Sequence, residues 1–130
     1  MIAVDTNVLV RLLVGDVAAQ ENAALRAVQA ADGVLLLDTV LLETVWVLQS
    51  VYGAGRQEVC DSLQRVLTLG TPQTAMAPHA LQWFAEGMDF ADALHLAGAA
   101  AGRCQVLLSF DARFARAAKG RTACAVLRPR

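Results

Sequence analysis

Two kinds of hydrophobic pattern alternate along the chain. In the first, short continuous runs of apolar residues are typical of strands buried in a parallel sheet. These predicted strands are 1–5, 34–37, 75–77, 105–109 and 123–127. In the second, apolar residues recur every three or four positions, as on the buried face of a helix. These predicted helices are 7–14, 17–31, 40–52, 56–69, 78–86, 89–101 and 111–118.

The order of these elements predicts an α/β fold. Strands that alternate with helices form parallel sheets with helices on both faces. We therefore expect a three-layer α/β/α sandwich with a central, mainly parallel sheet. A length of 130 residues fits a single domain, 1–130, with a core of its own. No repeat, low-complexity tract or linker divides the sequence.

Composition excludes a disordered chain and gives no sign of a membrane span. Hydrophobic residues make up 56% and charged residues 18%, and no apolar run approaches the roughly 18 residues of a membrane helix. The N-terminus lacks the basic and apolar regions of an export signal. The three cysteines have no paired spacing, as is typical of reduced thiols, so we expect a cytoplasmic protein. The apolar excess suggests a partner or dimer surface.

The charges are unevenly distributed along the chain. The net charge is −1, yet residues 103–130 hold seven Lys or Arg against one Asp. Residues 1–102 hold four Lys or Arg against eleven Asp or Glu. The basic segment is either a solvated face or a margin that faces phosphate groups beside an acidic pocket.

Two carboxylates follow predicted strands. Asp5 ends the first strand, so it lies at the carboxyl edge of the sheet, where open α/β folds bind ligands. Asp111 follows the strand 105–109 by two residues and can face the same edge. Either residue can also act as an N-cap, because a cap oxygen satisfies the free N–H groups of the next helix. For Asp5 this role is not required, since Thr6 could also cap.

Two further carboxylates lie within predicted helices. Three valines share the helix face of Glu43, which predicts a buried carboxylate, and burial without a partner costs several kcal/mol. The alternative is a glutamate at the helix edge that reaches solvent. Asp92 follows Asp89 by three residues, the spacing of a capping box. The cap role suits Asp89 better than Asp92, which leads into an apolar run.

As a set, these four carboxylates predict a bound cation. Two carboxylates 4 Å apart repel by about 4 kcal/mol at an effective dielectric near 20, so a fold gathers them only around positive charge. Oxygen ligands suit Mg²⁺ or Mn²⁺. Such ions assist phosphodiester hydrolysis by lowering the pKa of a water molecule and by stabilising the leaving oxygen.

Several other polar residues are weaker candidates. Thr6, Asn7 and Ser109 could orient ligands or a bound water, although ordinary caps and turns explain them equally well. Asp89 is a fifth carboxylate close to the set. His95 lies one turn after Asp92 and fits a core or helix-surface histidine better than a ligand or base.

Four motifs, in chain order, resemble those of the PIN-domain ribonucleases. They are Val4-Asp5-Thr6-Asn7-Val8-Leu9, Leu42-Glu43, Asp89-Phe90-Ala91-Asp92-Ala93-Leu94-His95-Leu96-Ala97 and Leu108-Ser109-Phe110-Asp111. The first and third motifs are fairly specific and the last is less so. The whole chain is similar, above all, to the VapC-type toxins of bacterial toxin–antitoxin pairs.

This resemblance implies a Mg²⁺- or Mn²⁺-dependent endoribonuclease on a compact α/β/α sandwich. It assigns the acidic quartet to Asp5, Glu43, Asp92 and Asp111, with Ser109 hydrogen-bonding near the metal. It also implies a homodimer that is inhibited by a cognate, VapB-like antitoxin. That antitoxin lies in an apolar groove and directs a basic side chain toward the acidic pocket.

The same resemblance suggests roles for the quartet in RNA hydrolysis. We expect in-line attack of water on an RNA phosphodiester, leaving a 5′-phosphate and a 3′-hydroxyl. Asp5 and Asp92 would be the main metal ligands. Glu43 would be a ligand or the base for the water, and Asp111 an outer or second-metal ligand.

Three arginines of the basic segment are candidates for holding the RNA backbone. They are Arg103, Arg113 and Arg116. The planar guanidinium group suits phosphate, and the assignment is an argument from charge alone.

Other functions stay open at the level of sequence. A phosphatase resembling the haloacid-dehalogenase enzymes would use Asp5 as nucleophile, but it needs a second aspartate where Asn7 stands. A phospho-receiver domain needs an early acidic pair that is absent here. A PIN-like protein that acts mainly as a protein-binding module, with little or no catalysis, would keep its fold and its partner after the loss of any carboxylate.

Overall fold

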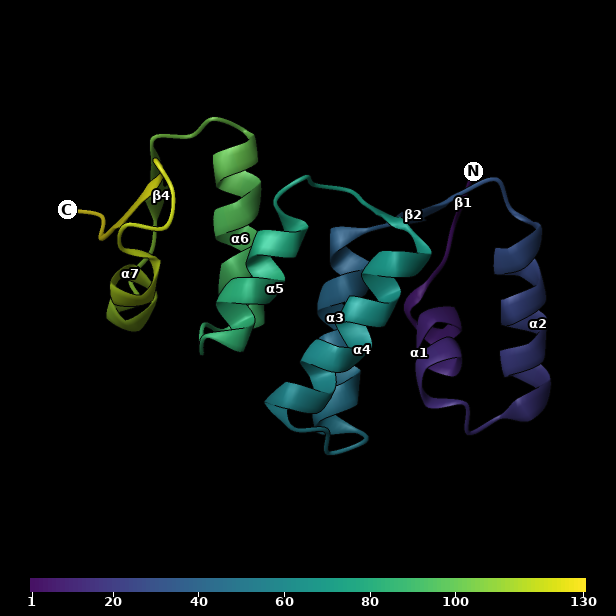
Figure 1. The fold of residues 1–130 in the computed structure, drawn as a ribbon. Coiled ribbons are helices and arrows are strands. Elements are labelled where there is room, and N and C mark those ends of the chain that lie inside the picture. The colour runs from purple at the N-terminus through teal and green to yellow at the C-terminus, as the bar shows by residue number, and fades with distance from the viewer. The chain divides into compact units, whose positions relative to one another are not determined.

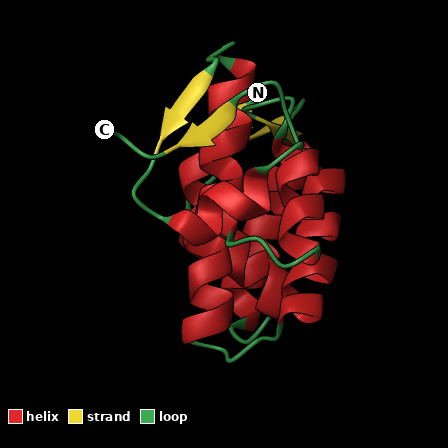
Figure 2. Ribbon diagram, turned by 90° about the vertical axis from the view of Figure 1, so that its left-hand side faces the viewer, coloured by secondary structure: helices red, strands yellow, loops and turns green.

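The computed structural model describes all 130 residues, and helices dominate the chain (Figures 1 and 2). Contacts group the chain into two compact units, Met1–Gln73 (unit 1) and Thr74–Arg130 (unit 2). Every strand pairing in the two units is parallel, which confirms the predicted α/β class. None of the helices is long and apolar enough to cross a membrane.

Unit 1 has a three-stranded parallel sheet in the order β1-β2-β3. Its elements are β1 (Ile2–Ala3), α1 (Thr6–Val14), α2 (Ala18–Ala30), β2 (Val34–Leu36), α3 (Asp38–Ser50), α4 (Arg56–Leu69) and β3 (Thr71–Pro72). In the register of the sheet, Ile2 pairs with Val34, and Leu35 pairs with Thr71. Helix α1 packs against both α2 and α3 (Figure 1). The carboxyl ends of three parallel strands therefore share one edge, and Asp5 follows the first of them.

The core of unit 1 lies around the central strand β2 and the apolar faces of its helices. Val34 and Leu36 of β2 are buried, as are Val45 of α3 and Val59 and Val66 of α4. Close packing extends to the start of β3, since a Cβ atom added at position 70 would lie 2.7 Å from a backbone carbonyl oxygen of β2. A glycine is therefore required at that position.

Unit 2 consists of a helical hairpin and a βαβ segment. Its elements are α5 (Ala77–Ala85), α6 (Phe90–Ala101), β4 (Val106–Leu108), α7 (Ala112–Ala118) and β5 (Ala125–Leu127). Strands β4 and β5 form a two-stranded parallel sheet. Small residues allow α5 and α6 to pack closely, because Ala80, Ala93 and Ala97 are all fully buried.

The turn between α5 and α6 determines where α6 begins. Gly87 has a φ of 111°, a conformation that side-chain-bearing residues rarely adopt. On the two sides of this turn, Phe84 and Phe90 form an edge-to-face pair with ring centroids 5.5 Å apart. Asp89, immediately before Phe90, caps α6, and its Oδ1 accepts a hydrogen bond from the backbone N–H of Asp92. The turn, the aromatic pair and the cap together fix the start of the helix that carries Asp92.

One local prediction was wrong. The third strand is Thr71–Pro72 and not 75–77, because pairing with β2 and not an apolar run defines it. Pro72 is tolerated there because β3 is an edge strand and needs no N–H for a further neighbour. Residues 74–77 form a turn, in which the Thr74 hydroxyl accepts a hydrogen bond from the N–H of Met76. Helix α3 begins at Asp38, two residues before the predicted start at residue 40.

Candidate functional site

Asp5 follows β1 and caps α1, which is one of the two roles predicted for it. Its Oδ1 accepts a hydrogen bond from the N–H of Val8 at 3.0 Å. Its backbone is extended and its side chain is exposed. The cap uses one carboxylate oxygen and fixes the direction of the side chain. Thr6, which could also have capped, is instead the first residue of the helix.

A cavity of about 780 Å³ opens beside Asp5 within unit 1. Its walls come from β1, α1 and α2, and most of the residues that line them are apolar, among them Ile2, Val8 and Ala24. Asp5 and Asn7 supply polar groups to the same wall. The cavity is therefore an apolar groove with a carboxylate in its lining.

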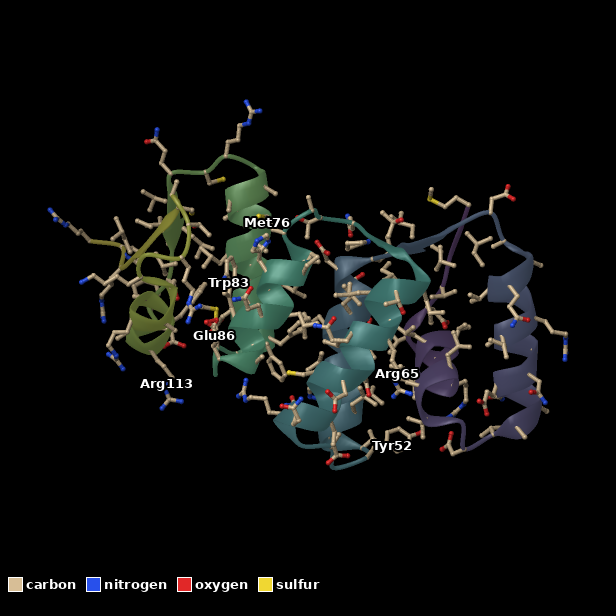
Figure 3. All side chains as sticks on the ribbon, viewed as in Figure 1. Tyr52, Arg65, Met76, Trp83, Glu86 and Arg113 are labelled. Carbon is tan, nitrogen blue, oxygen red and sulfur yellow. The ribbon has the colours of Figure 1, made fainter.

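A cluster of polar side chains ties together the helices around this cavity. Arg11 of α1 donates from Nε to Gln20 and from Nη1 to Asp16, both at 2.8 Å. Tyr52, which follows α3 (Figure 3), donates from its hydroxyl to Asp16 at 3.0 Å. Since Arg11 and Gln20 also line the cavity, this cluster holds α1 and α2 at a fixed separation.

Glu43 is exposed, so the argument from its burial was wrong. The buried face of α3 contains Leu41, Val45 and Leu48, and Glu43 lies outside it, as does Trp46, whose side chain is 63% exposed. A spacing of three or four residues identifies a stripe but does not say which of two neighbouring stripes packs against the other helices, here α1 and α4. The exposed carboxylate is free to bind a ligand and needs no cation to explain it.

Asp38 is a carboxylate that is not among the candidates identified from the sequence. It follows β2 after one residue, and its N–H donates to the side chain of Gln73, which follows β3, at 3.0 Å. Its Oδ1 is buried without a hydrogen-bond partner, and burial raises the pKa of its carboxyl group. An acid directly after a buried strand was the signal that identified Asp5, and the same signal identifies Asp38.

Unit 2 brings three of the candidate acids into one electrostatic cluster. Burial raises the pKa of Asp92, and the negative charges of Asp89 and Asp111 raise it further, while His95 lowers it. Asp92 is half-buried in the first turn of α6, and its neighbours Ala93 and Leu94 are in the core. Ionised Asp92 is thus in an environment that a positive charge would stabilise.

Asp111 is held by the motif around it. Its Oδ1 accepts hydrogen bonds from the N–H groups of Arg113 and Phe114, at 2.8 and 3.2 Å, and so caps α7. Its own N–H donates to the hydroxyl of Ser109 at 3.1 Å. Ser109 thus orients the backbone of the acid. Asp5, Asp89 and Asp111 each use only Oδ1 in their caps.

The basic residues of unit 2 lie on its surface. Arg103, Arg113 and Arg116 are exposed, and none of them forms an ion pair. Figure 3 shows Arg113 extending outward from α7. By contrast, Arg121 binds Glu86, at the end of α5, with 3.1 Å between Nη1 and Oε2. Six of the seven basic residues after position 102 are therefore available to bind an anionic partner.

Direct metal-binding geometry is not preformed within either unit. In neither of them do three or more His, Cys, Asp or Glu side chains approach closely enough to hold a metal ion. What each unit does provide is a set of oriented carboxylates, with Asp5, Asp38 and Glu43 in unit 1 and Asp89, Asp92 and Asp111 in unit 2.

Comparison with known protein families assigns the chain to one of them. The model of the PIN domain matches residues 2–120 and so runs through both units. The chain belongs to the PIN domain family, whose members are generally nucleases and typically use a divalent metal ion. No curated protein and no solved structure matches the chain.

Proposed function

We propose that this protein is a metal-dependent endoribonuclease and the toxin of a VapBC-type toxin–antitoxin pair. Membership of the PIN domain family supports hydrolysis of a phosphodiester. The observation that carries the proposal further is the acidic cluster of unit 2, where Asp89 and Asp111 raise the pKa of Asp92. A protein gathers like charges in this way where a cation or another positive group is to bind.

The donor chemistry of the candidate residues fits Mg²⁺ or Mn²⁺. All four acids of the quartet supply carboxylate oxygens, the ligands that these ions prefer. Asp5 and Asp111 each use one carboxylate oxygen in a helix cap, and the other oxygen remains available for a ligand. The caps also orient both side chains before any ligand binds.

In this proposal Asp5 and Asp92 are the main metal ligands, with Asp111 as an outer one. When bound, the ion makes a water molecule more acidic and stabilises negative charge on the phosphate. Glu43 either binds the ion or accepts the proton of the attacking water. Ser109 fixes Asp111 through the hydrogen bond to its N–H, and Thr6 and Asn7 orient groups around Asp5.

The free arginines of unit 2 support RNA as the substrate. Arg103, Arg113 and Arg116 are exposed and have no acidic partner, so no ion pair has to be broken before they bind phosphate. Arginine matches phosphate with two parallel hydrogen bonds. Contacts of this kind position the backbone and carry no base specificity.

The groove of unit 1 supports an antitoxin as the partner. An apolar segment fits walls formed by residues such as Val8 and Ala24, and a Lys or Arg at its end would find Asp5 in the same wall. A cation there would compete with the metal for the carboxylate. Mixing the protein with the product of the neighbouring gene, followed by size-exclusion chromatography, tests this partner and the proposed homodimer together.

The central test is RNA cleavage by the purified protein. We expect cleavage of total RNA in Mn²⁺ or Mg²⁺, none in EDTA, and products whose 5′-phosphate allows direct adaptor ligation. Asp5→Asn and Asp92→Asn should each lower the rate of cleavage by more than roughly 10–100-fold, which is the effect of removing a residue that only supports a metal ligand. The matched control is Asp32→Asn, because Asp32 is exposed and lies outside the candidate site.

A protein-binding module is the second candidate function. It is favoured by the three N-caps, since Asp5, Asp89 and Asp111 each have a structural reason to be present. Under this alternative, no RNA is cut in any metal, and Asp5→Asn binds the partner as the wild type does. The cleavage assay and the partner assay therefore separate the two candidates.

A further inference from the structure

An aromatic ring lies open to solvent immediately before Asp111. The side chain of Phe110 is 71% exposed. The guanidinium carbon of Arg128, which follows β5, lies over this ring at 5.6 Å from its centroid. A single exposed ring needs no explanation, but a contiguous exposed apolar patch marks a binding site, and Leu108 and Leu127 are exposed as well.

The sheet of unit 2 produces this arrangement. Leu108 at the end of β4 pairs with Leu127 at the end of β5, so the residues that follow them leave the sheet together. Both leucines are exposed, at 64% and 50%, and they continue the apolar surface from Phe110. The ring and the guanidinium group are therefore brought together by the register of two parallel strands.

We propose that Phe110, with Arg128, forms a stacking platform for one unpaired base of the RNA substrate, next to Asp111. This inference rests on the proposed nuclease function and adds a substrate contact to it. Bases of single-stranded RNA stack on aromatic rings and on the plane of arginine, whereas paired bases are not accessible in this way. The platform therefore selects an unpaired nucleotide.

Charge complementarity favours RNA over a protein as the occupant. Asp111 is the one acid in residues 103–130, against seven Lys or Arg. Arg113, Arg116 and Arg128 are exposed without an ion pair. The phosphates of RNA would pair with these cations, and its flat bases would stack on the ring.

The position of the ring next to Asp111 gives the platform a consequence for cleavage. Neighbouring Cα atoms are about 3.8 Å apart, so a base on Phe110 carries its own phosphate close to the carboxylate that follows. Stacking would then choose which phosphodiester is presented to the acidic residues. Phe110 is in this sense a substrate-binding residue that affects specificity.

Binding of short RNA tests the proposal without cleavage. The probe is a fluorescein-labelled single-stranded oligoadenylate of twelve nucleotides, measured by anisotropy in EDTA with the Asp92→Asn protein. A second probe of the same length carries abasic residues, so it has the same phosphates without bases. A third carries 2-aminopurine, whose fluorescence falls when it stacks. The variants are Phe110→Leu, which removes the ring, and Phe110→Tyr, which keeps it.

We expect Phe110→Leu to weaken binding of oligoadenylate by roughly 5- to 100-fold, the range of a lost base–aromatic stack. It should leave the affinity for the abasic probe unchanged and abolish the quenching of 2-aminopurine. Phe110→Tyr should behave as the parent protein. Leu127→Ala is the matched control, since it removes an exposed apolar side chain of the same surface without removing a ring.

Three results would overturn the platform. One is equal binding of oligoadenylate by the parent and Phe110→Leu. The second is an equal loss of affinity in Leu127→Ala. The third is a loss of affinity accompanied by dissociation of a dimer on size-exclusion chromatography, which would make the surface a protein interface. Failure of the proposed nuclease function is distinguished by the cleavage assay. In that case the wild type would cut no RNA in Mn²⁺, whatever the binding experiments show.

Discussion

Replacing Asp92 by Asn separates a metal-binding role from a structural one. The backbone N–H of Asp92 donates to Asp89, but its own carboxylate forms no hydrogen bond in the structure. The substitution keeps the shape and the backbone bond and removes one negative charge from the cluster with Asp89 and Asp111. We therefore expect the metal-free variant to be at least as stable as the wild type at neutral pH.

The expected size of the metal effect follows from the length of the chain. At ten times its Kd, a ligand stabilises the folded state by about 1.4 kcal/mol. For 130 residues, an unfolding entropy of about 2.1 cal/mol/K per residue turns this into a rise of roughly 5 °C in Tm. Mn²⁺ at ten times its Kd should raise the Tm of the wild type by this amount and leave that of Asp92→Asn unchanged.

The pH dependence gives an independent check with a defined sign. Because the pKa of Asp92 is raised in the folded state, the folded protein holds this proton more tightly than the unfolded chain does. Ionised Asp92 therefore costs stability above the raised pKa. As the pH falls through that value toward the unfolded value near 3.9, the metal-free wild type should gain stability relative to Asp92→Asn.

Thermal melts by circular dichroism, with and without Mn²⁺, measure both effects. An equal rise in Tm for the wild type and Asp92→Asn would mean that Mn²⁺ binds elsewhere. A metal-free variant that is clearly less stable at neutral pH would contradict the assignment of the carboxylate as an uncompensated charge. Asp32→Asn, an exposed acid outside the cluster, should follow the wild type in every condition.

Further predictions concern packing and thiol accessibility. Gly70→Ala should destabilise the protein by about 1–3 kcal/mol in urea denaturation, because its Cβ would lie 2.7 Å from a carbonyl oxygen of β2. Gly98→Ala, in the middle of α6 with no neighbour within 4 Å, should instead stabilise it by roughly 0.5–1 kcal/mol. Of the three cysteines, only Cys104 is exposed, so one thiol should react rapidly with Ellman's reagent at pH 8. The other two should react only after denaturation, since burial also raises the pKa of both.

The helices could be predicted closely because they carry long periodic patterns. Helix α4 has the predicted bounds, and the others differ by no more than two residues at either end. The strand β3 could not be predicted, since it is two residues long and its pairing with β2 defines it. Its apolar content is low, so no local pattern marks it. Short strands of this kind depend on contacts that sequence periodicity does not contain.

For the candidate acids, too, some features could be predicted from the sequence and others could not. The caps formed by Asp5, Asp89 and Asp111 were predictable, because cap residues and first turns follow one another in sequence. The exposure of Glu43 could not be predicted, because it depends on which face of α3 packs against α1 and α4. The contact between Phe110 and Arg128 could not be predicted from the sequence either, since the register of β4 and β5 creates it.

The caps and the proposed metal role do not exclude each other. The N-terminus of a helix carries partial positive charge, which stabilises a carboxylate there and fixes its direction. A capped aspartate such as Asp5 or Asp111 is therefore an oriented ligand with one oxygen to spare. Asp92 has no such cap for its own side chain, and burial and two neighbouring acids act against its charge. A bound cation would stabilise Asp92 more than the capped acids, so its substitution should have the largest effect on metal affinity.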